Sequence, residues 1–433
     1  MDTWTRQAGY PLITVTRDAK DIHAEQEIFL QNAYDEPSDK FENLGFLWYV
    51  PLTWTDQSEL QFESLGPCNT HVNSKWMNKA PADFQLNTES DDDWFIVNVN
   101  QNMYYRVNYE NENWEKLSNY LIPSHTDIPI RNRGALISDA FNIGKSHRGD
   151  HVNALKIIQY LRDERDYNPW LTTRDNLGFT VHMIWRTSTY GFFERYIRYL
   201  NEPIYDELGW DFKKALEDDH IDYHNRVIAV ELACEYGNDD CIQNTTEQYH
   251  HWMYTGINEI REDTTTTVYC TSIRHGGHAE WDFAFNQHQM TDDDEEASEL
   301  RSAMACSRAS YTLQAYMDYF LNTSLATDVI GEVRDASGLG FNLAWDFVNI
   351  HFDSLYKSFG DSAYDTVWSF ADTMNTEKDR NEMEAFGLRY PDMPGTAAND
   401  FYYSLKKIKS NMAWMEKNEV ELRQWLEEIM SRT

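Results

Sequence analysis

The pattern of apolar and polar positions changes once along the chain, close to residue 110. Before that point, short apolar runs such as FLWYVPLTW (46–54) and DWFIVNVN (93–100) alternate with the two-residue period of strands that bury one face. Charged segments rich in turn-forming residues, such as DEPSDK (35–40), connect these runs. The pattern predicts a small antiparallel β-sandwich over residues 1–109.

After residue 110 the apolar positions follow the period of a helix to the end of the chain. Asp150 is the expected N-cap of a helix whose apolar face includes Leu155 and Leu161, and Asn418 is the expected N-cap of the last helix. Helices and breaks repeat over residues 110–433 without a strict sequence period. The pattern predicts a large α-helical superhelical domain, similar to HEAT and armadillo arrays, so the expected fold class is α+β and mostly α.

The composition is strongly acidic and argues against several kinds of partner. The 433 residues include 72 Asp and Glu but only 37 Lys and Arg, which gives a formal net charge of −35. Such a surface repels nucleic acid and anionic lipid, and it attracts basic peptides. No apolar run approaches the ~18 residues that a membrane-spanning helix needs. The first residues, MDTWTRQAGYPLITV, have no signal-peptide pattern, so we expect this sequence to be one piece of a larger protein.

Four of the five cysteines fall into two groups by their spacing. Cys234 and Cys241 enclose a short polar segment, and Cys270 and Cys306 frame a segment rich in charged and aromatic residues. Because disulfides persist in oxidising compartments, this spacing indicates an extracellular protein or a protein of the secretory-pathway lumen. The alternative is that these residues are buried thiols. Cys68 has no neighbour of this kind, so it is either a free thiol or bonded to another molecule.

Two sequons for N-glycosylation agree with a secretory protein. Asn244-Thr245-Thr246 and Asn322-Thr323-Ser324 both lie in polar sequence that we expect to form loops, where a glycan would remain in water. Adaptation to high salt would also produce an acidic composition. The cysteine spacing and the sequons favour a secreted protein over that alternative.

The sequence lacks the motifs of several enzyme classes. A zinc peptidase of the H-E-x-x-H type needs two histidines four residues apart with a glutamate as base, and no such string is present. The nearest histidines, His275, His278 and His288 close to Glu280, are expected to be surface or packing residues, because the Gly-Gly pair between the first two disfavours a helix. No G-x-S-x-G elbow and no Walker-type phosphate loop is present, and the acidic runs 91–93 and 292–296 lack the spacing of a calcium loop. We therefore assign no catalytic and no metal-ligating residue to this chain.

Several long strings resemble one protein family in the same order along the chain. They are WTRQAGYPLITV, YYRVNYENENWEKL, NRGALISDAFNIG, TTTVYCTSIRHGGHAEWDFAF and NMAWMEKNEVELRQWL. From Trp4 to about Trp425, the sequence resembles the C-terminal region of the gluzincin aminopeptidases, the aminopeptidase N family. The family's β-sandwich would cover residues 1–109 and its helical C-terminal domain residues 110–433.

The resemblance also implies which residues carry structure and which cofactor the family uses. It implies that the disulfides are Cys234–Cys241 and Cys270–Cys306. Zinc belongs to the family's catalytic domain, whose motifs are not in this sequence, so no cofactor is expected in this chain. Tyr364 falls where relatives carry an aromatic residue that can face the cavity, and the alternative is a packing tyrosine at the start of a helix.

In the family, the helical domain caps the active site, limits which peptides enter, and supplies much of the dimer contact in membrane-anchored members. The implied partners are therefore peptide substrates, the catalytic domain of the same parent chain, and a second copy in a homodimer. The chain departs from the family pattern between Asn322 and Trp345, where LATDVIGEVRDASGLGF replaces a longer basic segment. This departure changes the local wall of the family's cavity.

Two hypotheses for the function follow. In the first, the chain is the C-terminal, non-catalytic portion of a zinc-dependent metallo-aminopeptidase that removes N-terminal amino acids from peptides, as part of the ectodomain of a membrane-anchored parent. In the alternative, it belongs to a catalytically inactive homologue that acts as a binding or recognition ectodomain. The strong acidity and the departure between residues 322 and 345 motivate the alternative.

Overall fold

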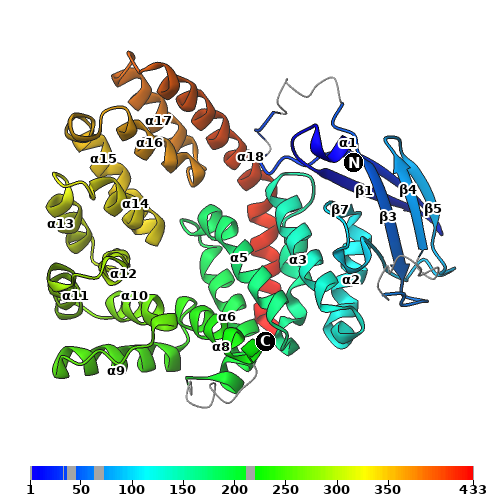
Figure 1. The fold of residues 1–433 in the computed structure, drawn as a ribbon, viewed down its shortest axis with the longest axis horizontal. Coiled ribbons are helices and arrows are strands. Elements are labelled where there is room, and N and C mark those ends of the chain that lie inside the picture. Colours follow the sequence, from blue (N-terminus) through cyan, green and yellow to red (C-terminus); the bar gives the residue numbers. More distant parts are fainter. Residues whose placement is uncertain (1, 33, 37–44, 63–72, 211–219, 433) are drawn as a thin grey trace. The chain divides into compact units, whose positions relative to one another are not determined.

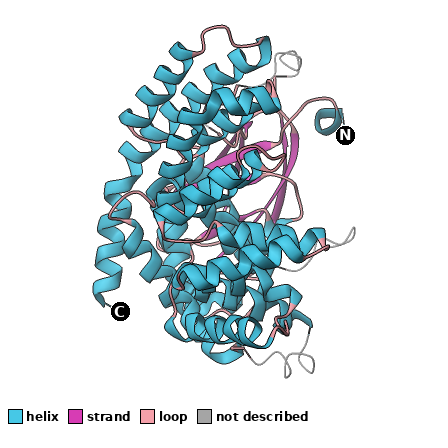
Figure 2. Ribbon diagram, turned by 90° about the vertical axis from the view of Figure 1, so that its left-hand side faces the viewer, coloured by secondary structure: helices cyan, strands magenta, loops and turns pink. Residues whose placement is uncertain are grey.

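The computed structural model of the chain describes residues 2–32, 34–36, 45–62, 73–210 and 220–432. The chain forms two compact units: unit 1 comprises Met1–Phe179 and Val420–Trp425, and unit 2 comprises Thr180–Glu419 and Leu426–Thr433. All described strands belong to unit 1, and helix is the dominant element of the chain (Figure 2). The predicted α+β, mostly α fold class is confirmed.

Unit 1 contains two small sheets (Figure 1). Their strands are β1 (Pro11–Asp18), β2 (Asp21–Ile28), β3 (Tyr49–Asp56), β4 (Asn73–Asn78), β5 (Ala82–Gln85), β6 (Phe95–Val97) and β7 (Arg106–Tyr109). One sheet has the order β5-β2-β1-β7, and the other has the order β4-β3-β6. β1 and β2 form a hairpin in which Pro11 pairs with Ile28 and Asp18 with Asp21.

One strand pair differs from the predicted antiparallel sandwich. β7 runs parallel to β1, with Leu12 opposite Arg106, while the other strand pairs of the described sheets are antiparallel. β7 follows β6, which belongs to the other sheet, so no tight hairpin fixes its direction relative to β1.

The strands are shorter than the apolar runs that predicted them. The run 46–54 becomes a strand only from Tyr49, because Gly45 (φ 68°) and Phe46 (φ 49°) have left-handed backbone conformations. The run 93–100 contributes only Phe95–Val97, because Asn98 has φ 66°. The apolar side chains of these runs and of β1 are still buried, and Leu12, Val15, Trp48, Val50, Leu52 and Ile96 are 0% exposed.

Unit 1 also contains helices that follow or precede the strands. They are α1 (Asp2–Thr5), α2 (Asn111–Ser124), α3 (Ile130–Lys145), α4 (Val152–Ile157) and the first part of α5 (Tyr167–Ile184). α4 begins after His151, so the prediction that Asp150 is its N-cap is wrong. An Asp150 carboxylate oxygen instead accepts a hydrogen bond from Asn111 at 2.6 Å.

Unit 2 consists of helices in its described part. They are the end of α5, α6 (Tyr190–Leu208), α8 (His220–Glu235), α9 (Asp239–Thr255), α10 (Thr265–His275), α11 (His278–Met290), α12 (Asp294–Met304), α13 (Ser310–Phe320), α14 (Ala326–Ala336), α15 (Gly338–Phe359), α16 (Ser362–Trp368), α17 (Glu377–Arg389) and most of α18 (Gly395–Arg432). Most consecutive helices between α9 and α16 lie side by side (Figure 1). None of the described helices has both the length and the apolar character needed to cross a bilayer.

The last helix differs from its prediction. Asn418 was expected to cap a separate final helix, but α18 continues through this position to Arg432. The Asn418 side chain is buried and donates to the carbonyl of Trp414 at 2.9 Å, so it bonds one turn back inside the helix instead of starting a new one.

The change from strand to helix lies where the sequence pattern places it, since β7 ends at Tyr109 and α2 begins at Asn111. The two compact units divide elsewhere, inside α5 between Phe179 and Thr180. The division into domains 1–109 and 110–433, and the superhelical arrangement of the helices, therefore stay predictions.

Candidate functional site

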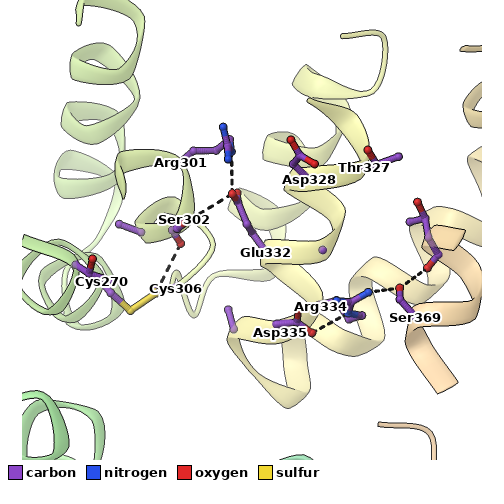
Figure 3. Close-up of a pocket in the computed structure, with 15 residues that line it drawn as sticks. Cys270, Arg301, Ser302, Cys306, Thr327, Asp328, Glu332, Arg334, Asp335 and Ser369 are labelled. Atoms are coloured by element: carbon purple, nitrogen blue, oxygen red, sulfur yellow. Dashed lines mark hydrogen bonds and ion pairs between the residues drawn. A yellow bond between two sulfur atoms is a disulfide. The ribbon is translucent and has the colours of Figure 1, made fainter. Parts of the chain in front are cut away.

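A pocket of about 700 Å³ lies within unit 2, among α10, α12, α14 and α16 (Figure 3). We call it the α14 pocket, because seven of its lining residues come from α14. The charged residues that line it are Arg301, Asp328, Glu332, Arg334 and Asp335, and the Cys270–Cys306 disulfide lies at its edge. All but one of these charged residues lie in residues 325–341, the segment predicted from the sequence to depart from the family pattern.

The sequence of α14 explains how its charged side chains reach the pocket. Val329, Ile330 and Val333 are fully buried in the core of unit 2. Asp328 and Glu332 are four residues apart, so they share a helix face and both line the pocket. The following helix approaches closely because Gly340 has no side chain: a Cβ atom there would collide with the carbonyl of Val333.

Glu332 is the most unusual group in the α14 pocket. Its Oε1 atom accepts from Arg301 Nε at 2.8 Å and from the Ser302 hydroxyl at 3.3 Å, whereas its Oε2 atom is buried and has no hydrogen-bond partner among the described residues (Figure 3). Burial raises the pKa of Glu332, and the neighbouring Asp328 carboxylate adds to the rise, against the opposing effect of Arg301. One oxygen of the carboxyl group is therefore buried without a donor from the described residues.

The second arginine of the pocket is already paired. Arg334 donates to both carboxylate oxygens of Asp335, at 2.7 and 2.6 Å, and also contacts the Ser369 hydroxyl. Its guanidinium carbon lies 5.5 Å from the centre of the Phe370 ring. Asp328, in contrast, is exposed, and no ion pair joins it to another described residue. The unpaired charge in the pocket is thus negative.

A second pocket of about 510 Å³ in unit 2 shares Cys306, Asp335 and Ala336 with the first. Its lining residues include Trp185, Tyr190, Glu194, Arg274, Arg308 and Asn342. Burial raises the pKa of Tyr190 to about 12, and the carboxylates of Glu235 and Glu194 contribute to the rise. Both pockets therefore combine carboxylates with guanidinium groups.

Comparison with known proteins identifies this helical region. The model of the ERAP1-like C-terminal domain matches residues 94–407, which is most of the chain. The chain belongs to the ERAP1-like C-terminal domain family. Aminopeptidase N from Bos taurus is 29% identical over 441 residues, and aminopeptidase N from Homo sapiens is 29% identical over 443 residues. Aminopeptidase Ey from Gallus gallus is 27% identical over 440 residues.

The alignments with these relatives show how much of each relative's length the chain covers. The alignment with the bovine protein covers 99% of this chain and 44% of the relative, and the alignment with the chicken protein covers 98% and 43%. The chain therefore spans less than half the length of the curated relatives it matches. The resemblance to the C-terminal region of the aminopeptidase N family is confirmed.

The structure contains the disulfides Cys234–Cys241 and Cys270–Cys306, the two pairs that membership of the family implies. Cys68 lies outside the described residues. Among the described residues, no three His, Cys, Asp or Glu side chains are grouped in a way that could hold a metal ion.

The residues of the acidic and histidine-rich segments have structural contacts. Glu280 accepts from the backbone N–H of Gly277 at 2.7 Å and lies 2.8 Å from His250 Nε2. His288 Nδ1 lies 3.0 Å from the carbonyl of Ala297. In the run 292–296, Asp293 caps α12 by accepting from the backbone N–H groups of the next turn.

The two sequons lie in different local structures. Asn322 is exposed in the turn between α13 and α14, as expected. The expectation of a loop is wrong for Asn244, which lies in α9 and donates to the carbonyl of Asp240 at 2.9 Å. The polar residues of α9 suggested a loop because Asn238, which caps this helix, was not recognised as its start.

Tyr364 lies on α16 in the core of unit 2 and is 5% exposed. Its ring centre lies 4.9 Å from that of Phe352 and 5.7 Å from that of Trp368. These are the contacts of a packing residue, while Thr366 and Ser369, just beyond Tyr364 in the chain, line the α14 pocket. Sequence reasoning did not single out Arg301 or Glu332. The signal that the sequence offered was the pair Asp328 and Glu332, two acidic residues four positions apart in the segment between Asn322 and Trp345.

Proposed function

We propose that this chain is the C-terminal, non-catalytic portion of a zinc-dependent metallo-aminopeptidase and that unit 2 lines the cavity that receives the peptide. The family match over residues 94–407 supports this proposal, as does the similarity to proteins named aminopeptidase N. In this proposal the zinc and its acid–base partner belong to the catalytic region of the same parent. The parent is an extracellular, membrane-anchored glycoprotein, and its helical region also contributes to a homodimer.

The observation that carries the proposal is the excess negative charge of the α14 pocket, in which Glu332 pairs with Arg301 but Asp328 has no ion-pair partner among the described residues. Glu332 Oε2 has no donor among the described residues, and Asp328 is exposed on the same helix face. Peptide N–H groups and cationic side chains supply the donors that these oxygens lack. A helical wall around a peptide also limits which substrates enter and excludes water from the reacting centre.

The test compares the chain alone with the chain joined to its upstream region. We expect the joined protein, but not the chain alone, to hydrolyse an aminoacyl-arylamide. In the joined protein, Glu332→Gln should raise the KM for a peptide with a basic residue beyond its first position and leave the KM for the arylamide unchanged. Glu416→Gln on α18 is the control, because it removes one negative charge from an exposed position outside the pocket.

Turnover of the arylamide by the chain alone would contradict the non-catalytic role. Equal changes in the KM for the basic peptide in Glu332→Gln and Glu416→Gln would show that the α14 pocket does not bind the peptide. The alternative function, a recognition ectodomain without activity, is favoured by the fact that the pocket wall comes from the departing segment. A joined protein that binds basic peptides through Glu332 but hydrolyses neither substrate would support it.

A further inference from the structure

The two disulfides of unit 2 differ in exposure. Cys234 and Cys241 are 1% and 0% exposed, and they pack in a small core with Tyr205, Val230 and Ala233. Cys270 and Cys306 are only partly buried, and both line the α14 pocket. Cys306 also lines the second pocket. A small thiol in either pocket can thus reach the second disulfide but not the first.

The two sulfur atoms of the accessible disulfide have different electrostatic surroundings. Arg274 Nη2 lies 3.4 Å from Cys270 Sγ, and the same guanidinium is held in place by Glu235, which accepts from Nη1 at 2.7 Å. A neighbouring guanidinium stabilises a thiolate, although Glu235 offsets part of this effect. Cys306 Sγ lies 3.9 Å from the carbonyl of Ser302 and has no such partner among the described residues. Cys270 is therefore the better leaving group.

We propose that Cys270–Cys306 is a thiol–disulfide exchange site and that small extracellular or lumenal thiols are its reactants. The thiolate of the reactant attacks Cys306 Sγ, the S–S bond breaks, and Cys270 leaves as a thiolate beside Arg274. A second thiol then attacks the reactant's sulfur in the mixed disulfide and releases Cys306. The two reactant thiols are oxidised to one disulfide, and the two cysteines are reduced.

The end of α12 has other contacts that would hold it after reduction. Trp281 Nε1 donates to the carbonyl of Met304 at 3.1 Å, and the Tyr316 hydroxyl donates to the carbonyl of Arg301 at 2.9 Å. Because Cys306 and Ala336 line both pockets, exchange at Cys306 places the reactant in the wall between them. The exchange therefore changes the pockets while the surrounding helices stay folded.

The first experiment uses the two disulfides as each other's control. Existing thiols of the full chain are blocked, the chain is treated with glutathione under native conditions, newly formed thiols are alkylated, and peptides are mapped by mass spectrometry. We expect Cys270–Cys306 to be reduced at least about tenfold faster than Cys234–Cys241. We also expect the glutathione mixed disulfide on Cys306. Equal rates, faster reduction of Cys234–Cys241, or glutathione on Cys270 alone would overturn the proposal.

Two substitutions test the attack of the reactant thiolate and the departure of the Cys270 thiolate separately. Arg274→Gln removes the cation beside the leaving thiolate, so it should slow reduction several-fold by both glutathione and the uncharged dithiothreitol. Arg308 is exposed in the second pocket with Cys306 and attracts an anionic reactant. Arg308→Gln should therefore slow the reaction with glutathione more than the reaction with dithiothreitol. Circular dichroism checks that both variants fold, and unchanged rates in both folded variants would contradict the assigned roles.

Discussion

Two arginine–carboxylate pairs of unit 2 use the same chemistry, but the pKa of the acid is lowered in one pair and raised in the other. Asp379 accepts two hydrogen bonds from Arg186, at 2.7 and 3.0 Å, and one from each of the backbone N–H groups of Asn375 and Thr376, at 2.9 and 3.0 Å. Glu332 accepts from Arg301 and Ser302 through one oxygen only. Both side chains are largely buried, so exposure does not separate the two sites.

The number of donors decides the direction of the pKa shift. Burial by itself raises the pKa of Asp379, but the hydrogen bonds and the charge of Arg186, with hydrogen bonds from the Asn375 backbone and from Thr376, lower it below the ordinary value overall. At Glu332 the burial effect is larger than the effect of its donors, and the pKa is raised. Asp379 therefore has four donors among the described residues, whereas the Oε2 atom of Glu332 has none.

The largest expected effect comes from breaking the completed pair. Asp379→Asn leaves the Arg186 guanidinium, which is 15% exposed, without its counter-charge. Breaking a buried pair in this way costs about 3–5 kcal/mol of unfolding free energy. Urea denaturation of the full chain measures this loss of unfolding free energy.

Glu332→Gln is the matched control for Asp379→Asn. It also removes the counter-charge of an arginine, Arg301, which is 15% exposed, but the raised pKa of Glu332 means that folding favours its ionised form less, so the loss should be smaller than for Asp379→Asn. Equal losses in the two variants would show that the distinction between a structural pair and a ligand-binding pair is wrong.

A smaller effect is expected from the glycine that allows α14 and α15 to approach. Gly340→Ala adds a Cβ atom that collides with the carbonyl of Val333, so the two helices must separate. Such overpacking costs about 1–3 kcal/mol. Gly331→Ala is the control, because Gly331 lies on α14 where an added Cβ atom meets only the far end of the Arg334 side chain, at 3.9 Å. A Gly340→Ala variant as stable as Gly331→Ala would contradict the close helix contact.

The two arginine–carboxylate pairs also show which parts of the site can be predicted from the sequence and which cannot. The change from strands to helices near Tyr109 follows from local periodicity, and the resemblance implied both disulfide pairs. The arginine pairs depend on positions far apart in the chain, 31 residues for Arg301 and Glu332 and 193 for Arg186 and Asp379. No local pattern specifies such a pairing.

The errors in the sequence predictions have a similar cause. Asn418 and Asn244 are residue types that favour caps and loops, but both lie inside helices, where Asn418 is buried and Asn244 follows the cap Asn238. The parallel direction of β7 depends on its partner in the sheet, which the chain order does not fix.

The pH dependence of stability should separate the two carboxyl groups. Because the pKa of Asp379 is lowered on folding, its contribution is present above its unfolded value, about 3.9, and is lost as the pH falls through the folded value. Because the pKa of Glu332 is raised, its contribution is present below its unfolded value, about 4.3, and is lost as the pH rises through the folded value.

Urea denaturation between about pH 3 and pH 8 measures both slopes. Asp379→Asn should flatten the acid side of the stability curve, and Glu332→Gln should flatten the decline that begins above about pH 4.3. If both substitutions flattened the same side, the opposite directions of the two pKa shifts would be refuted.

The smallest expected effect concerns Tyr364, which falls where relatives carry an aromatic residue that can face the cavity. Its ring packs against Phe352 and Trp368, and no described residue forms a hydrogen bond with its hydroxyl group. Tyr364→Phe keeps the ring, so the unfolding free energy should change by less than about 0.5 kcal/mol. In the joined protein the KM for a basic peptide should also stay unchanged, in contrast to Glu332→Gln. A change in KM without a change in stability would instead show that the Tyr364 hydroxyl contacts the peptide. Tyr364 would then count among the ligand-binding residues of unit 2 and not among its packing residues.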